Sequence, residues 1–287
     1  HGRIRRQRQM CIRDRLGAGQ MMFLKVIVAI DPDQNPKDLE AFLDALNDKV
    51  EIGEDVVVLP GMVADSLEAA SPFENVHDKL LIDATTLVPT DPRSPDEPLE
   101  GSYNQPTPAW RQGTVASDPF DNLEAVEALP DVRQARMLRD NMLVVSTPVV
   151  GTPSPRTGQH EGDDAQEAQR IEQINRLRDS IWQLDSAKNL RWLFITNDDL
   201  DMTHTKARRR LLWQLTARFD VGRGLTFDEG RDRLCWDATT PIPSEEHGVR
   251  RWPAVTLHDE ETLAKVAAHP ELSKYEWPPH LSFGGPE

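Results

Sequence analysis

The sequence predicts an α/β protein in which two related strand–helix–strand units pack as layered α/β sheets, with a proline-rich insert between them. Two observations lead to this prediction. An apolar strand, an acidic turn and an amphipathic helix follow one another twice along the chain. Each series then closes with a strand that ends in the same motif, Asp-Ala-Thr-Thr, which begins at Asp83 and again at Asp237. One structural plan is therefore expected to occur twice.

The first unit is expected over residues 16–87. Its opening run of Val, Ile and Leu is nearly continuous, as in a parallel strand covered on both faces. Asp31 and Asp33 follow this run in a turn, since Asp, Asn and Pro favour turns. The next residues carry leucines at helical spacing. In order, the expected elements are a strand over 21–30, a helix over 37–50, a strand over 55–59 ended by Pro60 and Gly61, and a strand over 80–82.

The second unit is expected over residues 122–255. Asp199 and Asp201 follow its apolar strand as Asp31 and Asp33 follow the first one. In order, the expected elements are two short helices over 122–129 and 131–139, a strand over 142–147, a helix over 164–184, a strand over 192–196, a helix over 206–219, and strands over 225–227 and 233–236. The Arg, Glu and Gln residues of the 164–184 helix are interpreted as a solvated face.

Three segments fall outside the units. Residues 1–15 hold six arginines, unlike the rest of the chain, and are interpreted as a non-native or disordered leader. Half of the 22 prolines lie between Pro89 and Pro155. Because proline interrupts helices and strand ladders, residues 88–121 are expected to form an extended insert. Residues 256–287 are expected to form an extended C-terminal tail.

The totals limit the classes of function. A formal charge of −15 over 287 residues disfavours non-specific nucleic-acid binding, because polyanions repel an acidic surface. No apolar run is long enough for a transmembrane segment. Two cysteines, Cys11 and Cys235, cannot form a disulfide framework, so a reducing compartment and a cytoplasmic location are expected.

No residue of the sequence is assigned a catalytic or a metal-binding role. The carboxylates of the acidic turns, which include Asp31, Asp33, Asp199 and Asp201, have oxygen ligands that suit Mg²⁺. They also suit turns and helix caps, which is the favoured interpretation. Arg208, Arg209 and Arg210 are interpreted as a solvated face. Cys235 lies in an apolar strand and is expected to be a buried, inert thiol.

The combined motifs resemble the C-terminal domain of the UbiD-type decarboxylases. In the second unit the resemblance lies in the helix that ends at Arg218-Phe219-Asp220 and in the strand that reaches Asp237. The first unit shares it through Ala70-Ser71-Pro72, through the strand that reaches Asp83, and through Lys49, which matches Arg218. Two such copies, preceded by Gly17-Ala18-Gly19-Gln20-Met21, resemble the long form found among menaquinone-biosynthesis decarboxylases.

The resemblance implies a non-oxidative decarboxylase of aromatic or unsaturated acids that uses prenylated FMN, with a divalent metal (Mn or Mg) and K⁺ in the parent enzyme. Catalytic and metal-binding residues of that family lie in an upstream flavin-binding domain that no segment here matches, so none is assigned and no cofactor is expected on this chain alone. Gln20 is the one candidate at the cofactor edge. The implied partners are the missing flavin-binding domain and further copies in a homo-oligomer, with closure of the active site by hinge motion.

Two other readings stay open. One is a free-standing assembly module without activity, suggested by the lack of an apparent active site. The other is a metal-dependent transferase that uses the acidic turns. In each reading Asp31, Asp33, Asp83, Asp199, Asp201, Arg218 and Asp237 mark the shared structural motif.

Overall fold

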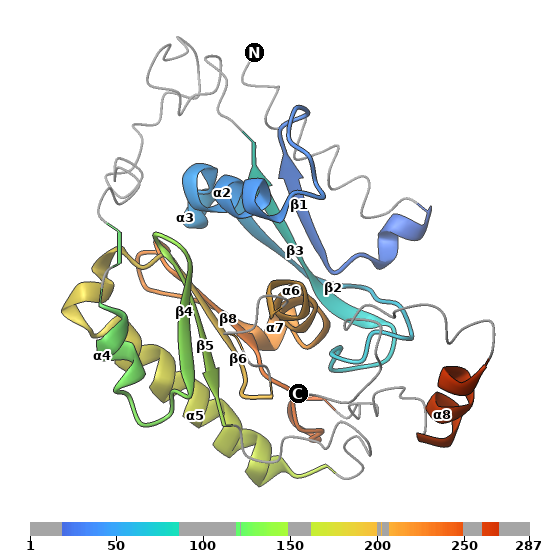
Figure 1. Cartoon of the computed structure of the whole chain (residues 1–287). Coiled ribbons are helices and arrows are strands. Elements are labelled where there is room, and N and C mark those ends of the chain that lie inside the picture. Colours follow the sequence, from blue (N-terminus) through green and yellow to red (C-terminus); the bar gives the residue numbers. More distant parts are fainter. Residues whose placement is uncertain are drawn as a thin grey trace.

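A computed structural model describes residues 19–85, 119–120, 122–148, 162–199, 202, 207–248 and 260–269. These residues form a three-stranded sheet, a five-stranded sheet and the helices that cover them (Figure 1). The predicted α/β class is confirmed. The predicted order of strand, turn, helix and strand occurs in both halves. No helix in the described part of the chain is both long and apolar enough to span a bilayer.

The first unit is a mixed sheet with strand order β1-β3-β2. β1 runs parallel to β3, and β2 runs antiparallel to it. Helix α2 begins after Asp38, whose carboxylate accepts hydrogen bonds from two backbone N–H groups of the first turn. The elements are η1 (Gly19–Phe23), β1 (Val26–Ile30), α2 (Leu39–Lys49), α3 (Ile52–Asp55), β2 (Val56–Val63) and β3 (Val76–Ala84).

Strand β2 does not end at Pro60 and Gly61, so that prediction is wrong. The strand continues to Val63, and its register with β3 shifts between Leu59 and Met62. β2 is an edge strand, where the missing N–H of proline breaks no ladder. Gly61 takes a positive φ of 64°, which suits a bulge, and its N–H donates to Asp78 at 2.8 Å.

The second unit repeats this plan and adds to it. β6 is parallel to β8, and β7 is antiparallel to β8, as in the first sheet. The repeated elements are β6 (Trp192–Asn197), α6 (Ala207–Ala217), α7 (Val221–Gly224), β7 (Leu225–Phe227) and β8 (Leu234–Ala238). The additional ones are α4 (Leu123–Glu127), β4 (Gln134–Arg139), β5 (Met142–Thr147), α5 (Asp164–Trp182) and η3 (Asp185–Asn189), which give the strand order β4-β5-β6-β8-β7.

The strand registers align the two units residue by residue. Val26 pairs with Leu80 as Trp192 pairs with Leu234. The backbone N–H of Leu80 donates to Lys25 at 2.9 Å, and that of Leu234 donates to Arg191 at 2.8 Å. Lys25 and Arg191 are therefore equivalent, and the second unit is a structural repeat of the first.

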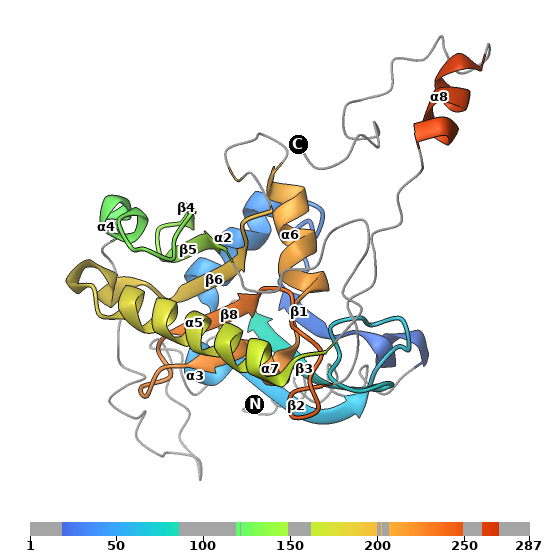
Figure 2. The ribbon, with the colours of Figure 1, turned by 90° about the horizontal axis from the view of Figure 1, so that it is seen from below.

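The described residues form two apolar cores, of which the larger joins the two units. The larger core contains residues of both units, so the inner faces of the two sheets share one interior. Its members include Leu80 and Ile82 from β3 and their equivalents Leu234 and Trp236 from β8. The smaller core lies between the five-stranded sheet and α5, which runs across the outer face of that sheet (Figure 2).

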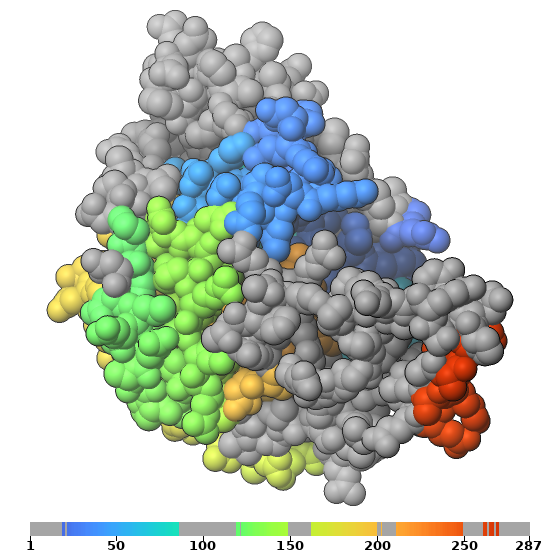
Figure 3. Space-filling view, in the orientation of Figure 1, coloured from blue at the N-terminus to red at the C-terminus, as the bar shows by residue number. Residues whose placement is uncertain are grey.

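The segment 131–139 is a strand over most of its length, so its predicted helix is wrong. β4 pairs antiparallel with β5 through a short turn at Asp140 and Asn141. Arg139, at the end of β4, donates to the carboxylate of Glu40 at 2.8 Å and also bonds Asp44 on α2. In the space-filling view the surface of β4 lies directly against the first unit (Figure 3).

Two further expectations are wrong. Helix α8 (Glu260–Ala268) lies within the segment expected to be an extended tail. Glu167, Arg170 and Gln173 of α5 are buried, although they were assigned to a solvated face. The insert 88–121 lies outside the described residues except for Pro119 and Phe120, and the leader 1–15 lies outside them entirely.

Candidate functional site

A group of buried charges lies at the carboxyl end of β8. Asp237, near the end of that strand, accepts a hydrogen bond from Nη1 of Arg170 on α5 at 2.8 Å. The same Arg170 nitrogen also bonds Oγ1 of Thr239 at 2.6 Å. Two further guanidinium nitrogens donate to the carboxylate of Glu167, each at 2.8 Å. One arginine thus joins α5 to the end of β8 in the protein interior.

The charges of this group are balanced by contact. Only 3% of the Arg170 side chain and none of the Glu167 side chain is exposed. Burial disfavours the charged guanidinium, but Asp237 and Glu167 reverse this effect and hold the pKa of Arg170 above its usual value. Glu167 also accepts from the backbone N–H of Ile242 at 2.8 Å, which fixes the chain after β8.

The repeated motif Asp-Ala-Thr forms the same turn in both units. Asp237 accepts from the backbone N–H of Thr239 at 2.9 Å and from its hydroxyl at 2.6 Å. Asp83 accepts from the N–H of Thr85 at 3.2 Å and from its hydroxyl at 2.6 Å. Both carboxylates therefore stabilise the turn that leaves the sheet.

A second group lies at the carboxyl end of β6. Arg218 donates to both oxygens of Asp199, at 2.9 and 2.6 Å, and to Asn197 at 3.3 Å. Asn197 also accepts from the N–H of Thr240 at 2.8 Å, which ties β6 to the chain after β8. In the first unit Lys49 pairs with Asp31 at 2.7 Å. The match of Lys49 with Arg218 thus extends to their contacts, since each pairs with the carboxylate of its own acidic turn.

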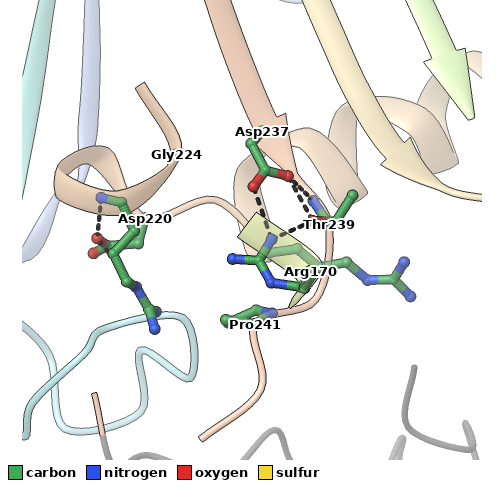
Figure 4. A pocket seen from close by; sticks show the side chains of 8 residues that line it. Arg170, Asp220, Gly224, Asp237, Thr239 and Pro241 are labelled. Atoms are coloured by element: carbon green, nitrogen blue, oxygen red, sulfur yellow. Dashed lines mark hydrogen bonds and ion pairs between the residues drawn. The ribbon is translucent and has the colours of Figure 1, made fainter. Parts of the chain in front are cut away.

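A small pocket lies between these groups and α7 (Figure 4). Its lining residues carry mostly charged side chains: Arg170, Arg218, Asp220, Arg223, Gly224, Asp237, Thr239 and Pro241. The space accommodates about one water molecule. Asp220 caps α7 by accepting from the N–H of Arg223 at 3.1 Å, and burial raises the pKa of its carboxyl. The pocket is a packed junction, too small for an organic substrate.

A third cluster of polar residues lies at the interface between the two units. Lys25 pairs with Glu68 at 2.9 Å, and burial lowers the pKa of this lysine. Arg223 donates to the carbonyl oxygens of Ala70 and His247 and so joins α7 to the first unit. His77 on β3 is 1% exposed, and neither ring nitrogen has a hydrogen-bond partner. Burial, followed by the charge of Lys79, lowers the pKa of His77 to about 4.

Carboxylates of the acidic turns form ion pairs with basic side chains of the protein. Asp31 and Asp199 bind Lys49 and Arg218, and no group of three or more potential ligand side chains occurs in the parts of the chain that the structure describes. Asp33 is exposed in the turn after β1. Asp201 lies outside the described residues, as do the side chains of Arg208, Arg209 and Arg210. A calorimetric titration with Mg²⁺ or Mn²⁺ is expected to give no binding heat, and a saturable heat would support the transferase reading.

Cys235 is expected to be inert toward thiol reagents in the folded protein. Its side chain is 2% exposed, and burial raises the pKa of the thiol. In a Cys11→Ser variant, Ellman's reagent is expected to detect no thiol in native buffer and one in concentrated guanidinium chloride. Reaction in native buffer within minutes would contradict the buried position.

Two interactions of the site were not predictable as such. Glu167 and Arg170 stand three residues apart on one helix, a spacing that also fits a surface pair. Asp220 and Arg223 have the same spacing on α7.

Gln20, the one predicted cofactor contact, lies in η1 with an exposed side chain. None of the bonds of the three groups described above includes it.

Comparisons with known proteins agree on one family. Residues 5–84 match the family model of the 3-octaprenyl-4-hydroxybenzoate carboxy-lyase C-terminal domain, UbiD_C. The match begins within the predicted leader and ends with β3. It therefore contains the whole described part of the first unit up to the end of its last strand.

Two curated relatives have names that describe an activity. A phenolic acid decarboxylase of Escherichia coli O157:H7 is 35% identical over 100 residues, which are 33% of this chain and 20% of the relative. One of Sedimentibacter hydroxybenzoicus is 32% identical over 72 residues, 25% of this chain and 15% of the relative. The matched region thus spans a fifth or less of the length of either relative.

Solved structures of the same class also match locally. The closed form of vanillic acid decarboxylase from Sedimentibacter hydroxybenzoicus has 29% identity and a TM-score of 0.27, over 34% of this chain and 21% of that one. The UbiD-class enzyme HmfF from Pelotomaculum thermopropionicum, in complex with FMN, has 29% identity and a TM-score of 0.22, over 23% and 15%. Residues 5–84, which include the first unit, are thus similar to the C-terminal domain of UbiD-family proteins.

Proposed function

We propose that this chain is the C-terminal portion of a UbiD-like non-oxidative decarboxylase, with a role in oligomerisation and in closing the active site. The supporting observation is that the family match at 5–84 coincides with a complete strand–helix–strand unit. The proposed parent removes CO₂ from an aromatic or unsaturated acid. The names of the relatives favour a phenolic acid, and the doubled unit favours the long form associated with menaquinone or ubiquinone biosynthesis.

The proposed parent uses prenylated FMN with a divalent metal and K⁺, but the described residues do not fit such a group. The three arginines of the pocket already bind carboxylates or carbonyl oxygens of the protein: Arg170, Arg218 and Arg223. Gln20 offers an amide without charge, which is a weak partner for a phosphate. We therefore assign cofactor binding to the upstream flavin-binding domain and no catalytic step to the residues of this chain.

The contribution of this chain is mechanical in the proposal. Its two units share one core, and arginines bond across the seam between them. A rigid body of this kind transmits a hinge motion at one end to a surface at the other. Closure of a domain can set turnover without contact to the reacting atoms.

The DNA upstream of the codon for Leu16 provides the test. We expect an open frame that encodes a flavin-binding domain. The product of the whole frame, expressed with a supply of prenylated FMN in a cytoplasmic host, is expected to show flavin absorbance and to release CO₂ from phenolic acids such as vanillate. The chain alone is expected to do neither. A full-length product that binds no flavin would overturn the proposal.

The second candidate is a free-standing assembly module. The ion pairs of Arg170 and Arg218 favour it, because both arginines already bind carboxylates of the protein and the pocket beside them is too small for a substrate. A start codon at the beginning of the first unit would support this reading. Light scattering on the purified chain tests it, since a stable monomer would count against an assembly role.

A further inference from the structure

The two units differ in what lies beside the equivalent strands β1 and β6. In the second unit, β5 pairs with β6 in parallel, and the N–H of Trp192 donates to Asn141 at 3.0 Å at the start of this pairing. The equivalent strand of the first unit, β1, pairs with β3 on one edge, and no strand among the described residues pairs with its other edge. Val26 is the equivalent of Trp192, so the backbone groups of Val26, Val28 and Ile30 are directed to this second edge.

Side-chain burial follows the same difference. Every residue of β6 is buried, whereas every residue of β1 is only partly buried. Two residues before each strand, Leu190 is 0% exposed and its equivalent Leu24 is 41% exposed. Leu190 is covered in the core beneath α5, and the first unit has no described counterpart of that cover.

A second, independent difference concerns the helices. The β4–β5 hairpin of the second unit reaches α2 of the first unit, where Arg139 bonds Glu40 and Asp44. α6 is the equivalent of α2, and its residue in the place of Asp44 is Trp213, which is 49% exposed. Next to these residues, Leu43 of α2 is 8% exposed and Leu212 of α6 is 40% exposed. α6 thus presents apolar side chains where α2 is covered by a hairpin.

We propose that the free edge of β1, with Leu24, Leu212 and Trp213, is a docking site for a β-strand of another polypeptide. The added strand runs parallel to β1, as β5 runs parallel to β6, and an apolar hairpin turn covers Trp213. Main-chain hydrogen bonds to the edge supply affinity, and the aromatic side chain supplies selectivity.

The internal repeat argues against one simple occupant, a second copy of this chain. Two copies of this chain that paired by their β1 edges about a two-fold axis would place the strands antiparallel. The occupied equivalent in the second unit is parallel. The occupant is therefore a different segment, with an apolar residue in the position where the chain's own hairpin uses Arg139, because Trp213 replaces a carboxylate there. This inference uses only the internal repeat and does not depend on the decarboxylase proposal.

The chain itself provides the probe. A fluorescently labelled peptide of residues 132–148 contains the hairpin that occupies the equivalent edge, with Met142 aligned to Val26. In the probe Arg139 is replaced by leucine to suit Trp213. Titration of the full chain is expected to give saturable binding by fluorescence anisotropy. Trp213→Asp, which restores the residue of the first unit, is expected to weaken binding by about tenfold or more.

The matched control is Val266→Asp on α8, which places the same charge on a residue 38% exposed and away from β1 in both ribbon views (Figures 1 and 2). This variant is expected to bind the peptide as the parent chain does. Hydrogen exchange of the N–H groups of Val26, Val28 and Ile30 is expected to be fast in the chain alone and slower with the peptide, because these groups face away from β3.

Three results would overturn the proposal. They are a lack of saturable binding, equal binding by the Trp213→Asp variant, and full exchange protection of the same three N–H groups before any peptide is added. The last result would show that another segment of the same chain already occupies the edge.

Discussion

Replacement of Arg170 by leucine is expected to lower the free energy of unfolding by about 3–5 kcal/mol. The change leaves the carboxylates of Glu167 and Asp237 buried without their partner, and Glu167 has no exposed side-chain surface at all. An uncompensated buried charge is far more costly than the loss of an exposed pair. Urea denaturation at neutral pH, followed by circular dichroism, measures the effect.

The control for this variant lies on the same helix. Arg176 is 60% exposed on its side chain and pairs only with exposed Glu172. Arg176→Leu is expected to change the free energy of unfolding by about 0.5 kcal/mol or less. A third variant combines Arg170→Leu with Glu167→Gln and Asp237→Asn, and it is expected to recover part of the loss because both charges are gone. Equal stability of the two single variants would refute the assigned role of Arg170.

Acid is expected to destabilise the protein through His77. The folded-state pKa of His77 is about 4, below its ordinary value of 6.5, so the folded protein resists protonation of this ring. The contribution to stability is complete above pH 6.5 and is lost as the pH falls through 4. The difference between the two pKa values corresponds to about 3 kcal/mol. The charged groups that influence the ring are Lys79, Glu68, Lys25 and Asp78.

The measurement compares urea midpoints of the parent and of His77→Phe between pH 7.5 and pH 4. Phenylalanine also has an aromatic ring but lacks the two unpartnered nitrogens. The variant is therefore expected to match or exceed the stability of the parent at neutral pH. It is also expected to lose less stability in acid. Exposed His269→Phe serves as the control and is expected to follow the parent. Parallel pH profiles of the parent and His77→Phe would contradict this account.

The sequence was sufficient for the elements that its own periodicity determines. The repeated strand–turn–helix plan is confirmed, because apolar runs and Asp-containing turns are local signals. The equivalence of Lys49 and Arg218 is confirmed by their pairs with Asp31 and Asp199. The Asp-Ala-Thr-Thr sequence that the two units share corresponds to the same hydrogen-bonded turn, formed by Asp83 and by Asp237.

What the sequence did not reveal depends on distant partners. β4 is six residues long and its polar residues are compatible with a helix, so only its pairing with β5 identifies it as a strand. Arg170 is buried because Asp237 is there to receive it, 67 residues further along the chain. The strand β2 continues past Pro60 because it is an edge strand, and no local signal tells edge from centre.

The core shared by the two units has a consequence during synthesis. Leu80 and Ile82 pack with residues such as Trp192 and Trp236, which leave the ribosome more than 100 residues later. At about 5–20 residues per second, the first unit waits roughly 5–30 seconds before its apolar inner face can be covered. The nascent chain is therefore exposed to aggregation during this interval. Expression at low temperature with added chaperones is expected to raise the soluble yield.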